Sequence, residues 1–336
     1  MDWRRSYSST WRVFKVNKDT WADGEALVGV DSVSVTRTAD GSLLESGGIE
    51  LTGEVDPGYY RVVMTADQGG ELARVDVATL LFITNGGGYD YTTHTQTADG
   101  YSVLYPASVT AITNGSYAPA GVNGAEYAAD LLAAAINAPV ETEGTFTLNE
   151  PIVHALGSSV LEAAWAVLNA GGFVIQITGR GVVRICPKPT DPALILDSTN
   201  EGLMLNGTSF TADESGIPNR YIVIDGANLT MAANSDPESA VSTIARGYTV
   251  DQVDTSPTPV DGETLAEYAE RRLSELSVLI EEQSYTREYA AGVNLYDIVR
   301  ASLDAFEGDY RIASQTIACG NGITVAEKVE KETALW

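Results

Sequence analysis

The first hundred residues consist of short segments in which apolar and polar residues alternate, and this pattern restricts the fold more than any other feature of the sequence. The segments are TWRVFKV (10–16), ALVGVDSVSVTRT (26–38), GIELTGEV (48–55), GYYRVVMTA (58–66) and LARVDVATLLFIT (72–84). Turn-forming residues such as Asp56-Pro57-Gly58 and Gly69-Gly70 separate them. Alternation with a period of two is typical of strands. Short strands at this spacing predict an antiparallel barrel or sandwich.

Helical periodicity enters after the first third of the chain. Helices are predicted at residues 123–139, 158–172 and about 262–277. In the second of these, Ser159 and Glu162 have the spacing of a capping box, while Trp165 and Leu168 share one face. A hairpin is predicted at residues 173–189. The order of elements is therefore β-rich, then mixed, then β-rich again with one helix.

Length and charge restrict the class of protein. A chain of 336 residues is longer than one hydrophobic core usually supports, so two or three domains are expected. The chain has 46 acidic and 20 basic residues, which gives a net charge of −26. Because affinity for nucleic acids comes mainly from Lys and Arg at phosphates, the chain as a whole should repel DNA. The charge argues against a DNA-binding protein, but not against a wall past which DNA slides.

No motif in the sequence predicts a reaction centre. The two cysteines, Cys186 and Cys319, are 133 positions apart, and His94 and His154 lack the spacing of metal ligands. Phosphate-binding, dinucleotide-binding and serine-hydrolase motifs are not found in the sequence. We therefore expect no catalytic residue, no metal and no cofactor, and we expect that the protein is not an enzyme.

The sequence also predicts no membrane insertion. The opening residues, MDWRRSYSSTWRVFK, contain no apolar run of the kind found in signal peptides. The longest apolar-rich segment, residues 160–177, is interrupted by polar residues and by Gly171-Gly172. We expect a protein that is synthesised in the cytoplasm and has no membrane span.

The first 21 residues differ in composition from the remainder of the chain. They hold three of the five tryptophans, five basic residues and two acidic ones, so their net charge is +3 and the rest of the chain carries −29. Aromatic residues and arginine are enriched at the centres of protein interfaces. The candidate interface residues are Trp3, Arg4, Arg5, Trp11, Arg12 and Trp21, together with the terminal Trp336. The alternative is that Trp11 packs an edge strand and that the charges are solvated.

Four longer segments carry a resemblance to a known family. They are WRVFKVNKDTW with VDSVSVTRTADGSLLESGGIEL, then SSVLEAAWAVLNAGGFVIQITGRGVVRICPKP, then TLAEYAERRLSELS, and finally NLYDIVRASL with GDYRIASQTIACGNGITVAEKVEKE. Together they resemble the baseplate-hub, or tail-associated hub, proteins of long-tailed bacteriophages, in the order of elements from the first barrel to the closing hairpin. In the last segment, Leu295-Tyr296 stand where this family usually has a glycine.

The resemblance implies an α+β, mostly β fold with two antiparallel β-barrel domains, an α/β region between them and a few short helices. The expected domains are residues 1–108 for the first hub barrel, 109–192 for the α/β middle region, and 193–336 for the second hub barrel with its single helix. It further implies a homotrimer, in which two barrels from each chain form a ring of pseudo-sixfold symmetry.

The function implied is that of a structural hub in the virion, at the tail tip or baseplate. Such a ring joins the tail tube and the distal tail protein to the tip spike, fibres or receptor-binding proteins, and it lines the path of exiting DNA. The expected partners are further copies of the chain, the distal tail protein, the tape-measure protein and receptor-binding or spike proteins, with DNA passing through unbound. An acidic bore would repel the duplex and keep it moving, although solubility or a high-salt host would explain the same charge.

Two other functions are weighed against the hub. One is an adhesin or carbohydrate-binding protein of the tail tip, in which tyrosines stack on sugars, among them Tyr89, Tyr91, Tyr101 and Tyr105. The other is a cell-wall glycosidase that uses two carboxylates, for which the abundance of acidic residues gives almost no support.

Overall fold

The described residues are mostly β-structure with a few short helices, as the sequence predicts. The computed structural model describes residues 7–39, 45–51, 55–83, 89–92, 94–197, 204–255, 257, 259, 263–303 and 306–336. The chain forms two compact units. Unit 1 comprises Met1–Thr208 and Ser284–Val329, and unit 2 comprises Ser209–Gln283 and Glu330–Trp336.

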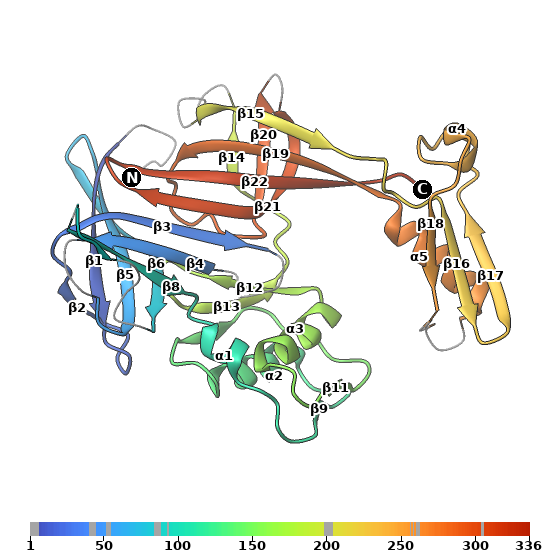
Figure 1. The fold of residues 1–336 in the computed structure, drawn as a ribbon, viewed down its shortest axis with the longest axis horizontal. Helices are drawn as coiled ribbons and strands as arrows, with labels where there is room; N and C mark the ends of the chain where they lie inside the picture. Colours follow the sequence, from blue (N-terminus) through green and yellow to red (C-terminus); the bar gives the residue numbers. More distant parts are fainter. Residues whose placement is uncertain are drawn as a thin grey trace. The chain divides into compact units, whose positions relative to one another are not determined.

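One large, largely antiparallel sheet dominates the fold (Figure 1). Its strands are β1 (Ser8–Val16), β2 (Asp23–Ala26), β3 (Val30–Thr38), β4 (Glu45–Leu51), β5 (Gly58–Gln68), β6 (Glu71–Phe82), β7 (Tyr89–Asp90), β8 (Thr95–Tyr101), β14 (Pro192–Leu196), β15 (Met204–Ala212), β19 (Val278–Glu288), β20 (Ile298–Leu303), β21 (Phe306–Cys319) and β22 (Ile323–Ala334). The strand order is β15-β19-β22-β21-β3-β4-β8-β6-β5-β1-β2. In addition, β20 pairs with β14 and β21, and β7 pairs with β8.

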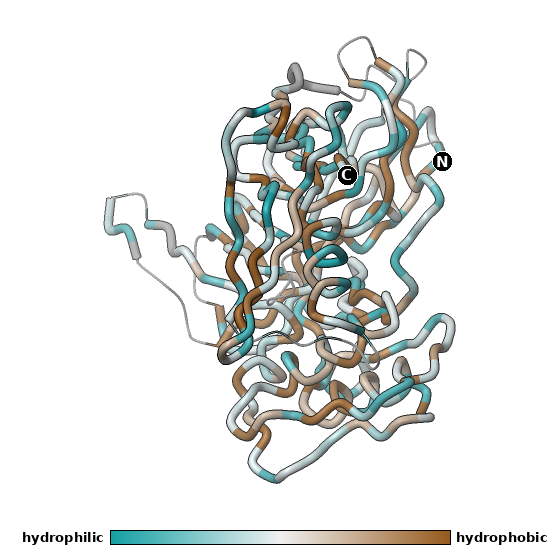
Figure 2. Tube along the Cα trace, turned by 90° about the vertical axis from the view of Figure 1, so that its right-hand side faces the viewer, coloured by the Kyte–Doolittle hydropathy of each residue, from teal (hydrophilic) through white to brown (hydrophobic). Residues whose placement is uncertain are grey.

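Side chains alternate between the two faces of this sheet, which is why the alternating segments form its strands. In β3, Val33 and Val35 are buried while Ser34 between them is exposed. In β21, Ile317 and Cys319 are buried on either side of an exposed alanine. Figure 2 shows hydrophobic and hydrophilic residues following one another along the strands. The burial of alternate apolar side chains fixes the pairing register, because a slip of one residue would turn each of them to the other face.

The two separate β-barrels expected from the resemblance are not found among the described strands. Strand β3 of the N-terminal part pairs with β21 of the C-terminal part, with Thr36 opposite Thr316 and Val35 opposite Ile317. The two β-rich regions therefore share one sheet. The physical reason is that β3 and β21 each present an edge of unpaired backbone groups, which the other strand satisfies. The division into residues 1–108, 109–192 and 193–336 stays a prediction.

The middle of the chain forms an α/β region within unit 1. Its helices are α1 (Tyr105–Val109), α2 (Gly124–Ala133) and α3 (Val160–Ala170), and its strands are β9 (Ser116–Ala118), β10 (Val140–Thr142), β11 (Ile152–His154), β12 (Phe173–Ile177) and β13 (Val183–Pro187). Strands β10, β13 and β12 form one small sheet, and β11 pairs with β9. The capping box predicted for α3 is present, with Ser159 and Glu162 each bonding the other's backbone N–H. The predicted hairpin is β12–β13.

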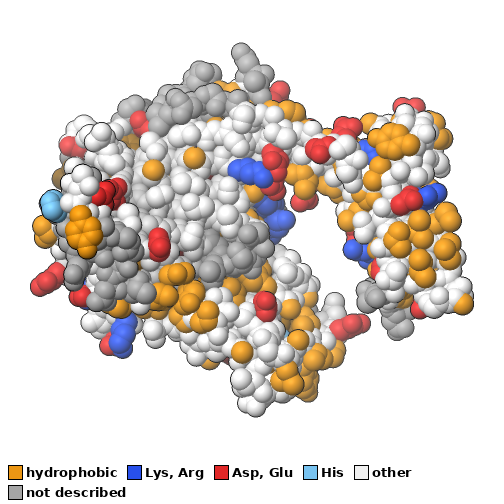
Figure 3. Space-filling model, in the orientation of Figure 1, with side chains coloured by type: hydrophobic (Ala, Val, Ile, Leu, Met, Phe, Trp, Pro, Cys, Tyr) orange, Lys and Arg blue, Asp and Glu red, His pale blue; other side chains and the backbone are white. Residues whose placement is uncertain are grey.

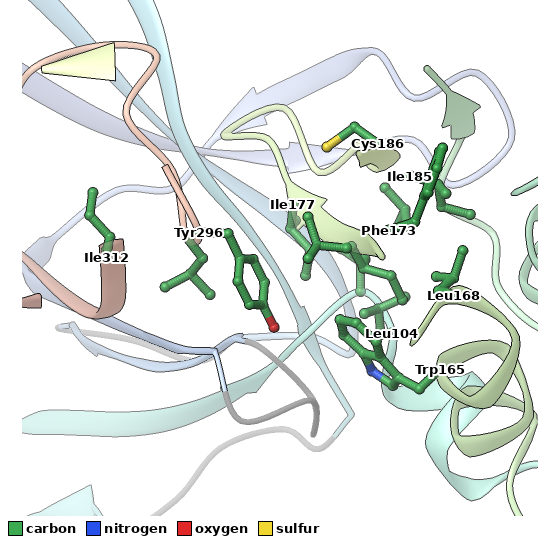
Figure 4. Close-up of a cluster of buried hydrophobic side chains, with 14 of the residues drawn as sticks. Leu104, Trp165, Leu168, Phe173, Ile177, Ile185, Cys186, Tyr296 and Ile312 are labelled. Carbon is green, nitrogen blue, oxygen red and sulfur yellow. The ribbon is translucent and has the colours of Figure 1, made fainter. Parts of the chain in front are cut away.

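The core of the α/β region is continuous with the core of the C-terminal strands in unit 1. Trp165 and Leu168 of α3 lie in one buried cluster with Phe173 of β12. The same cluster includes Tyr296 and Ile312 from the C-terminal part of the chain (Figure 4). The ring centroids of Trp165 and Tyr296 are 6.5 Å apart. Burial of these large side chains is the main stabilising contribution at this junction.

Unit 2 contains a small sheet covered by a helix on one face. Its elements are β16 (Arg220–Asp225), β17 (Asn228–Ala233), β18 (Asp251–Asp254), α4 (Thr243–Arg246) and α5 (Leu265–Leu276), with the strand order β17-β16-β18. Helix α5 corresponds to the helix predicted at about 262–277, and Thr264 and Glu267 form its capping box. Tyr268 and Leu273 of α5 pack on Tyr221 of β16. No helix in the described parts of the chain is long and apolar enough to cross a membrane.

Candidate assembly surfaces

Trp11 of β1, and Tyr7 just before this strand, form hydrogen bonds with the C-terminal part of unit 1. The indole Nε1–H of Trp11 donates to the carbonyl oxygen of Gly320, in the turn between β21 and β22, at 2.9 Å. The hydroxyl of Tyr7 donates to the carbonyl oxygen of Tyr289. The Trp11 ring is half-buried and packs against the buried cluster beneath the sheet. Trp11 therefore has a packing role within the chain, and part of its ring stays accessible.

The other face of β1 is the floor of a shallow groove of about 400 Å³. The groove is lined by Thr10, Trp11, Arg12, Phe14, Val63, Thr65 and Arg74. The strand pairing creates this arrangement, because Thr10 lies opposite Thr65 and Arg12 lies opposite Val63. Thr65 in turn lies opposite Arg74 of β6. We call it the Arg12 groove.

The two arginines of the Arg12 groove differ in their surroundings. Arg74 is paired with Asp23, lies 3.8 Å from Asp76, and stacks over the Phe14 ring at 5.7 Å. Arg12 is exposed, and none of the described residues forms an ion pair or hydrogen bond with its side chain. The groove therefore presents one neutralised guanidinium and one uncompensated guanidinium beside threonine hydroxyls.

Trp21 lies away from this groove, in a buried contact between the first strands and the β12–β13 hairpin. Its indole Nε1–H donates to the carbonyl oxygen of Arg180 at 2.7 Å, and its ring centroid is 5.0 Å from that of Tyr59. The guanidinium of Arg61, itself fully buried, donates to the same carbonyl at 3.0 Å and to Asp23 at 2.5 Å. Trp21 thus fixes the α/β region to the large sheet.

The hairpin approaches the sheet closely because its turn contains glycine. A Cβ atom on Gly179 would lie 1.8 Å from the carbonyl oxygen of Asp76, and one on Gly181 would lie 2.7 Å from the Thr79 side chain. Gly181 also has a φ of +76°, a conformation that glycine adopts without strain. The Thr79 hydroxyl donates to the carbonyl oxygen of Gly179 at 2.9 Å. Both glycines are therefore required for the hairpin to lie on the sheet.

Among the described residues, Trp336 is not part of the lining of the Arg12 groove. Trp336 belongs to unit 2 and is 38% exposed. Trp3, Arg4 and Arg5 lie outside the described residues. An interface role for the whole set stays a prediction.

Unit 2 has an apolar surface that the sequence reasoning missed. The face of the small sheet opposite α5 carries Ile222 and Ile224 of β16, Leu229 and Met231 of β17, and Val253 of β18. Leu229 is 62% and Met231 53% exposed. Hydrophobic side chains are seen to gather over β16 and β17 in Figure 3. The signal was present in RYIVID, in which Tyr221 and Val223 are buried against α5 while Ile222 and Ile224 on the other face are apolar too.

A second group of exposed apolar side chains lies on the β9–β11 pair of unit 1. Val153 and Tyr117 lie directly opposite each other, and both are exposed, as is Leu156 just after β11. Neighbouring exposed apolar side chains of this kind often mark protein interfaces. Units 1 and 2 therefore each have an apolar surface suited to a protein partner.

The described residues contain no group of three or more His, Cys, Asp or Glu that could hold a metal ion. His154 is buried, and its Nε2 lies 3.1 Å from the Tyr127 hydroxyl. Burial lowers the pKa of the His154 imidazole below its usual value. Cys186 and Cys319 are free and buried, and burial raises the pKa of the Cys319 thiol to about 12. The side chains of His154 and the two cysteines are packed in the protein interior, and neither cysteine is a reactive thiolate.

Unit 1 contains a buried ionic network around Glu327. Glu327 accepts from Arg287 at 2.8 Å (Nε) and 2.6 Å (Nη2), from the Tyr285 hydroxyl at 2.6 Å, and from Gln315 Nε2 at 2.7 Å. Burial alone would raise the pKa of Glu327, but the adjacent Arg287 guanidinium outweighs it and holds that pKa below its usual value. All four side chains are buried, so the network serves the architecture of the sheet.

A second buried pair shows the opposite balance. Glu45 accepts from Arg37 Nε at 2.8 Å, but its other carboxylate oxygen has no hydrogen-bond partner among the described residues. Burial therefore prevails over the attraction of Arg37, and the pKa of Glu45 is raised. The number of donors to each carboxylate decides the direction of the shift.

Comparisons with known proteins identify the fold. No protein-family model matches the chain, and no characterised protein matches it by sequence. In structure it is similar to a 43 kDa tail protein of prophage MuSo2 from Shewanella oneidensis, with a TM-score of 0.65 and 13% identity over 96% of this chain and 98% of that chain. It is also similar to a tail protein from Neisseria meningitidis MC58, with a TM-score of 0.65 and 12% identity over 98% of both chains.

Two further similarities extend the comparison. A prophage tail protein, gp18, from Listeria monocytogenes matches with a TM-score of 0.53 and 12% identity over 96% of this chain and 94% of that chain. A chain of the Francisella PdpA-VgrG complex matches with a TM-score of 0.59 and 7% identity, over 97% of this chain but 53% of that chain. Identities this low show a shared fold. The fold is that of phage tail proteins over nearly the full length of the chain, as the sequence resemblance predicted.

Proposed function

We propose that the chain is a structural component of a bacteriophage tail, located in the virion. The observation that supports this most is the extent of the structural match, which covers 98% of both this chain and the Neisseria meningitidis tail protein. A match over the full length of both proteins leaves no large domain of either without a counterpart. A structural role also agrees with the buried setting of the network around Glu327 and of His154.

In detail, we propose a baseplate or tail-tip hub, in which copies of the chain form a homotrimeric ring. The ring would join the tail tube and distal tail protein to a spike, fibres or receptor-binding proteins, with the tape-measure protein as a further partner. The exposed apolar side chains of β9–β11 and of the β16–β17–β18 face support a role in protein contacts. A structural hub acts through protein contacts and needs no reaction centre, so we propose no enzymatic activity.

Localisation and copy number test this proposal. A tagged chain is expressed in place of the natural one, purified virions are examined by cryo-electron microscopy, and the copies per tail are counted by quantitative mass spectrometry. We expect the protein at the tail tip with three copies per tail. Particles that lack the chain but keep complete, infectious tails would overturn the proposal, as would a copy number matching the repeated tube protein.

The passage of DNA through the ring is tested separately. The net charge of −26 predicts that duplex DNA is repelled from the assembled protein. In an electrophoretic shift assay at low salt, we expect no complex with a duplex of about 30 base pairs. Retained binding under these conditions would remove the acidic-bore hypothesis without affecting the structural role.

One observation favours a carbohydrate-binding function as the second candidate. The side chain of Tyr91 is 83% exposed, as stacking on a sugar would require. By contrast, the rings of Tyr101 and Tyr105 contact each other at 4.6 Å, and the side chain of Tyr89 lies outside the described residues. Glycan-array binding that is lost in Tyr91→Ala would support an adhesin, while no binding above background would count against it.

A further inference from the structure

The Arg12 groove is a cationic site on a strongly acidic protein. Of the 46 acidic and 20 basic residues in the chain, the first 21 residues contribute two acidic and five basic ones. Arg12 is exposed and has no partner among the described residues, while most arginines of the structure are paired with carboxylates. An uncompensated guanidinium beside a groove has five N–H donors available for a carboxylate.

The remaining lining of the groove suits a strand or an extended segment. Thr10 and Thr65 provide hydroxyls, Phe14 provides an apolar wall, and Arg74 provides a second guanidinium. Arg74 is already paired with Asp23, so it contributes to the wall more than to the net charge. The combination of an aromatic ring and arginine side chains is typical of interface centres.

Among the described strands, part of one backbone edge of β1 beside the groove has no partner. Strand β2 pairs with β1 at Phe14 and Val16, and the N–H of Leu27 bonds the carbonyl oxygen of Val13. From Ser8 to Arg12, no strand in the described parts of the chain pairs with this edge. Unpaired N–H and C=O groups along an edge strand are a template for a strand from another chain.

We propose that the Arg12 groove and the free edge of β1 bind an acidic extended segment of a second copy of this chain. Charge complementarity selects this occupant, because the residues outside the first 21 carry a net charge of −29, so a second copy is acidic on balance. The contact is heterologous, since a basic site on one copy meets an acidic site on the next. Heterologous contacts close into rings when the rotation between copies permits. The inference rests on the ring in the proposed function and assigns the surface that closes it.

The first experiment reverses the charge of Arg12. Purified wild-type protein, Arg12→Glu and the control Lys188→Glu are compared by analytical ultracentrifugation at 50 and 500 mM NaCl. Lys188 is exposed, lies outside the groove, and allows the same change of charge in unit 1. We expect wild type and Lys188→Glu to self-associate at low salt, and Arg12→Glu to show a dissociation constant raised roughly tenfold or more, because a charge-assisted pair becomes a repulsion. Circular dichroism and thermal melting check that the variants fold.

The second experiment identifies the occupant. Arg12→Lys places an amine in the groove that a zero-length carbodiimide reagent couples to a contacting carboxylate. Unlabelled and ¹⁵N-labelled protein are mixed before coupling, so that cross-links between copies carry one label of each kind. We expect Lys at position 12 to be joined to Asp or Glu of the other copy.

The inference would be overturned by unaltered self-association of Arg12→Glu, by a wild-type protein that stays monomeric at all concentrations, or by cross-links confined to one copy. Capture of a different tail protein by Lys at position 12 in virions would also overturn it, since the proposed occupant is a second copy. Its failure is distinguishable from failure of the proposed function. If the chain is found at the tail tip while Arg12→Glu assembles normally, the function stands and the groove assignment falls.

Discussion

Replacing Glu327 by glutamine is the most informative perturbation of unit 1, because it removes one charge from a buried network without changing its size. The carboxylate accepts four hydrogen bonds, two from the Arg287 guanidinium, one from Tyr285 and one from Gln315. The Arg287 side chain is 1% exposed. In Glu327→Gln the guanidinium loses its counterion in a site that water does not reach, and an amide N–H₂ is turned toward groups that are themselves donors.

The magnitude follows from the cost of an unpaired buried charge. Removing one partner of a buried ion pair costs about 3–5 kcal/mol of the free energy of unfolding. A loss of 1 kcal/mol lowers the melting temperature of a domain of this size by about 2–4 °C, so Glu327→Gln should lower the unfolding transition of unit 1 by roughly 6–20 °C. Differential scanning calorimetry measures the transition, and urea unfolding followed by circular dichroism gives the free energy.

Two further variants serve as controls. Asp309→Asn breaks the Arg300–Asp309 pair, which has the same two-bond geometry at 2.7 and 2.8 Å but lies on the surface, and it should leave the transition nearly unchanged. Combining Glu327→Gln with Arg287→Met removes the orphaned charge and should recover a large part of the loss. The reasoning is refuted if Glu327→Gln melts like wild type, or if the double variant is less stable than the single one.

Four smaller predictions follow from the same structure. Gly179→Ala places a methyl group on the carbonyl oxygen of Asp76, so it should cost about 1–3 kcal/mol and make the β12–β13 hairpin more sensitive to limited proteolysis. The pKa of Glu327 is lowered in the folded state, so the ionised carboxylate stabilises unit 1 at pH values above 4.5, the usual pKa of a glutamate. This stabilisation should be lost as the pH falls below 4.5. Melting temperatures measured over a range of pH should show that Glu327→Gln removes this dependence on acid. Ser159→Ala removes the cap of α3 and should cost about 1 kcal/mol in urea unfolding, with Ser159→Thr as the retained-cap control. The thiol of Cys319 should stay unmodified by iodoacetamide at pH 8 in the native protein and react in urea, because it is buried and its pKa is about 12. Rapid labelling of the native protein would contradict the buried position of Cys319.

Local elements were predictable from the sequence because their signals are local. The capping spacing of Ser159 and Glu162 marks the start of α3, and the turn in the predicted hairpin of residues 173–189 lies between β12 and β13. The pairing of β3 with β21 was not predictable, since alternation shows that a segment is a strand but does not identify its neighbour. The two barrels expected from the resemblance were wrong for the described strands for this reason.

The candidate surfaces could also be predicted only in part from the sequence. The composition of the N-terminal segment pointed to Arg12, which lies exposed in a groove, and its role in an interface stays a prediction. Composition does not reveal which way a tryptophan points, and Trp21 turned out to be buried against the hairpin. The apolar face of unit 2 was missed because Leu229 and Met231 lie in a segment whose burial cannot be judged until its covering helix is known.

The pairing of β3 with β21 has a consequence for biosynthesis. Thr36 and Thr316, whose hydroxyls lie 3.2 Å apart, are separated by 280 positions in the chain. On the ribosome β3 emerges long before β21 is synthesised, so the edge of β3 that pairs with β21 stays unpaired during most of translation. Long-range pairing of this kind slows folding and leaves an aggregation-prone intermediate. Production of this protein at reduced temperature or with chaperones should therefore raise the soluble yield, and truncations that end before residue 306 should be recovered as aggregates.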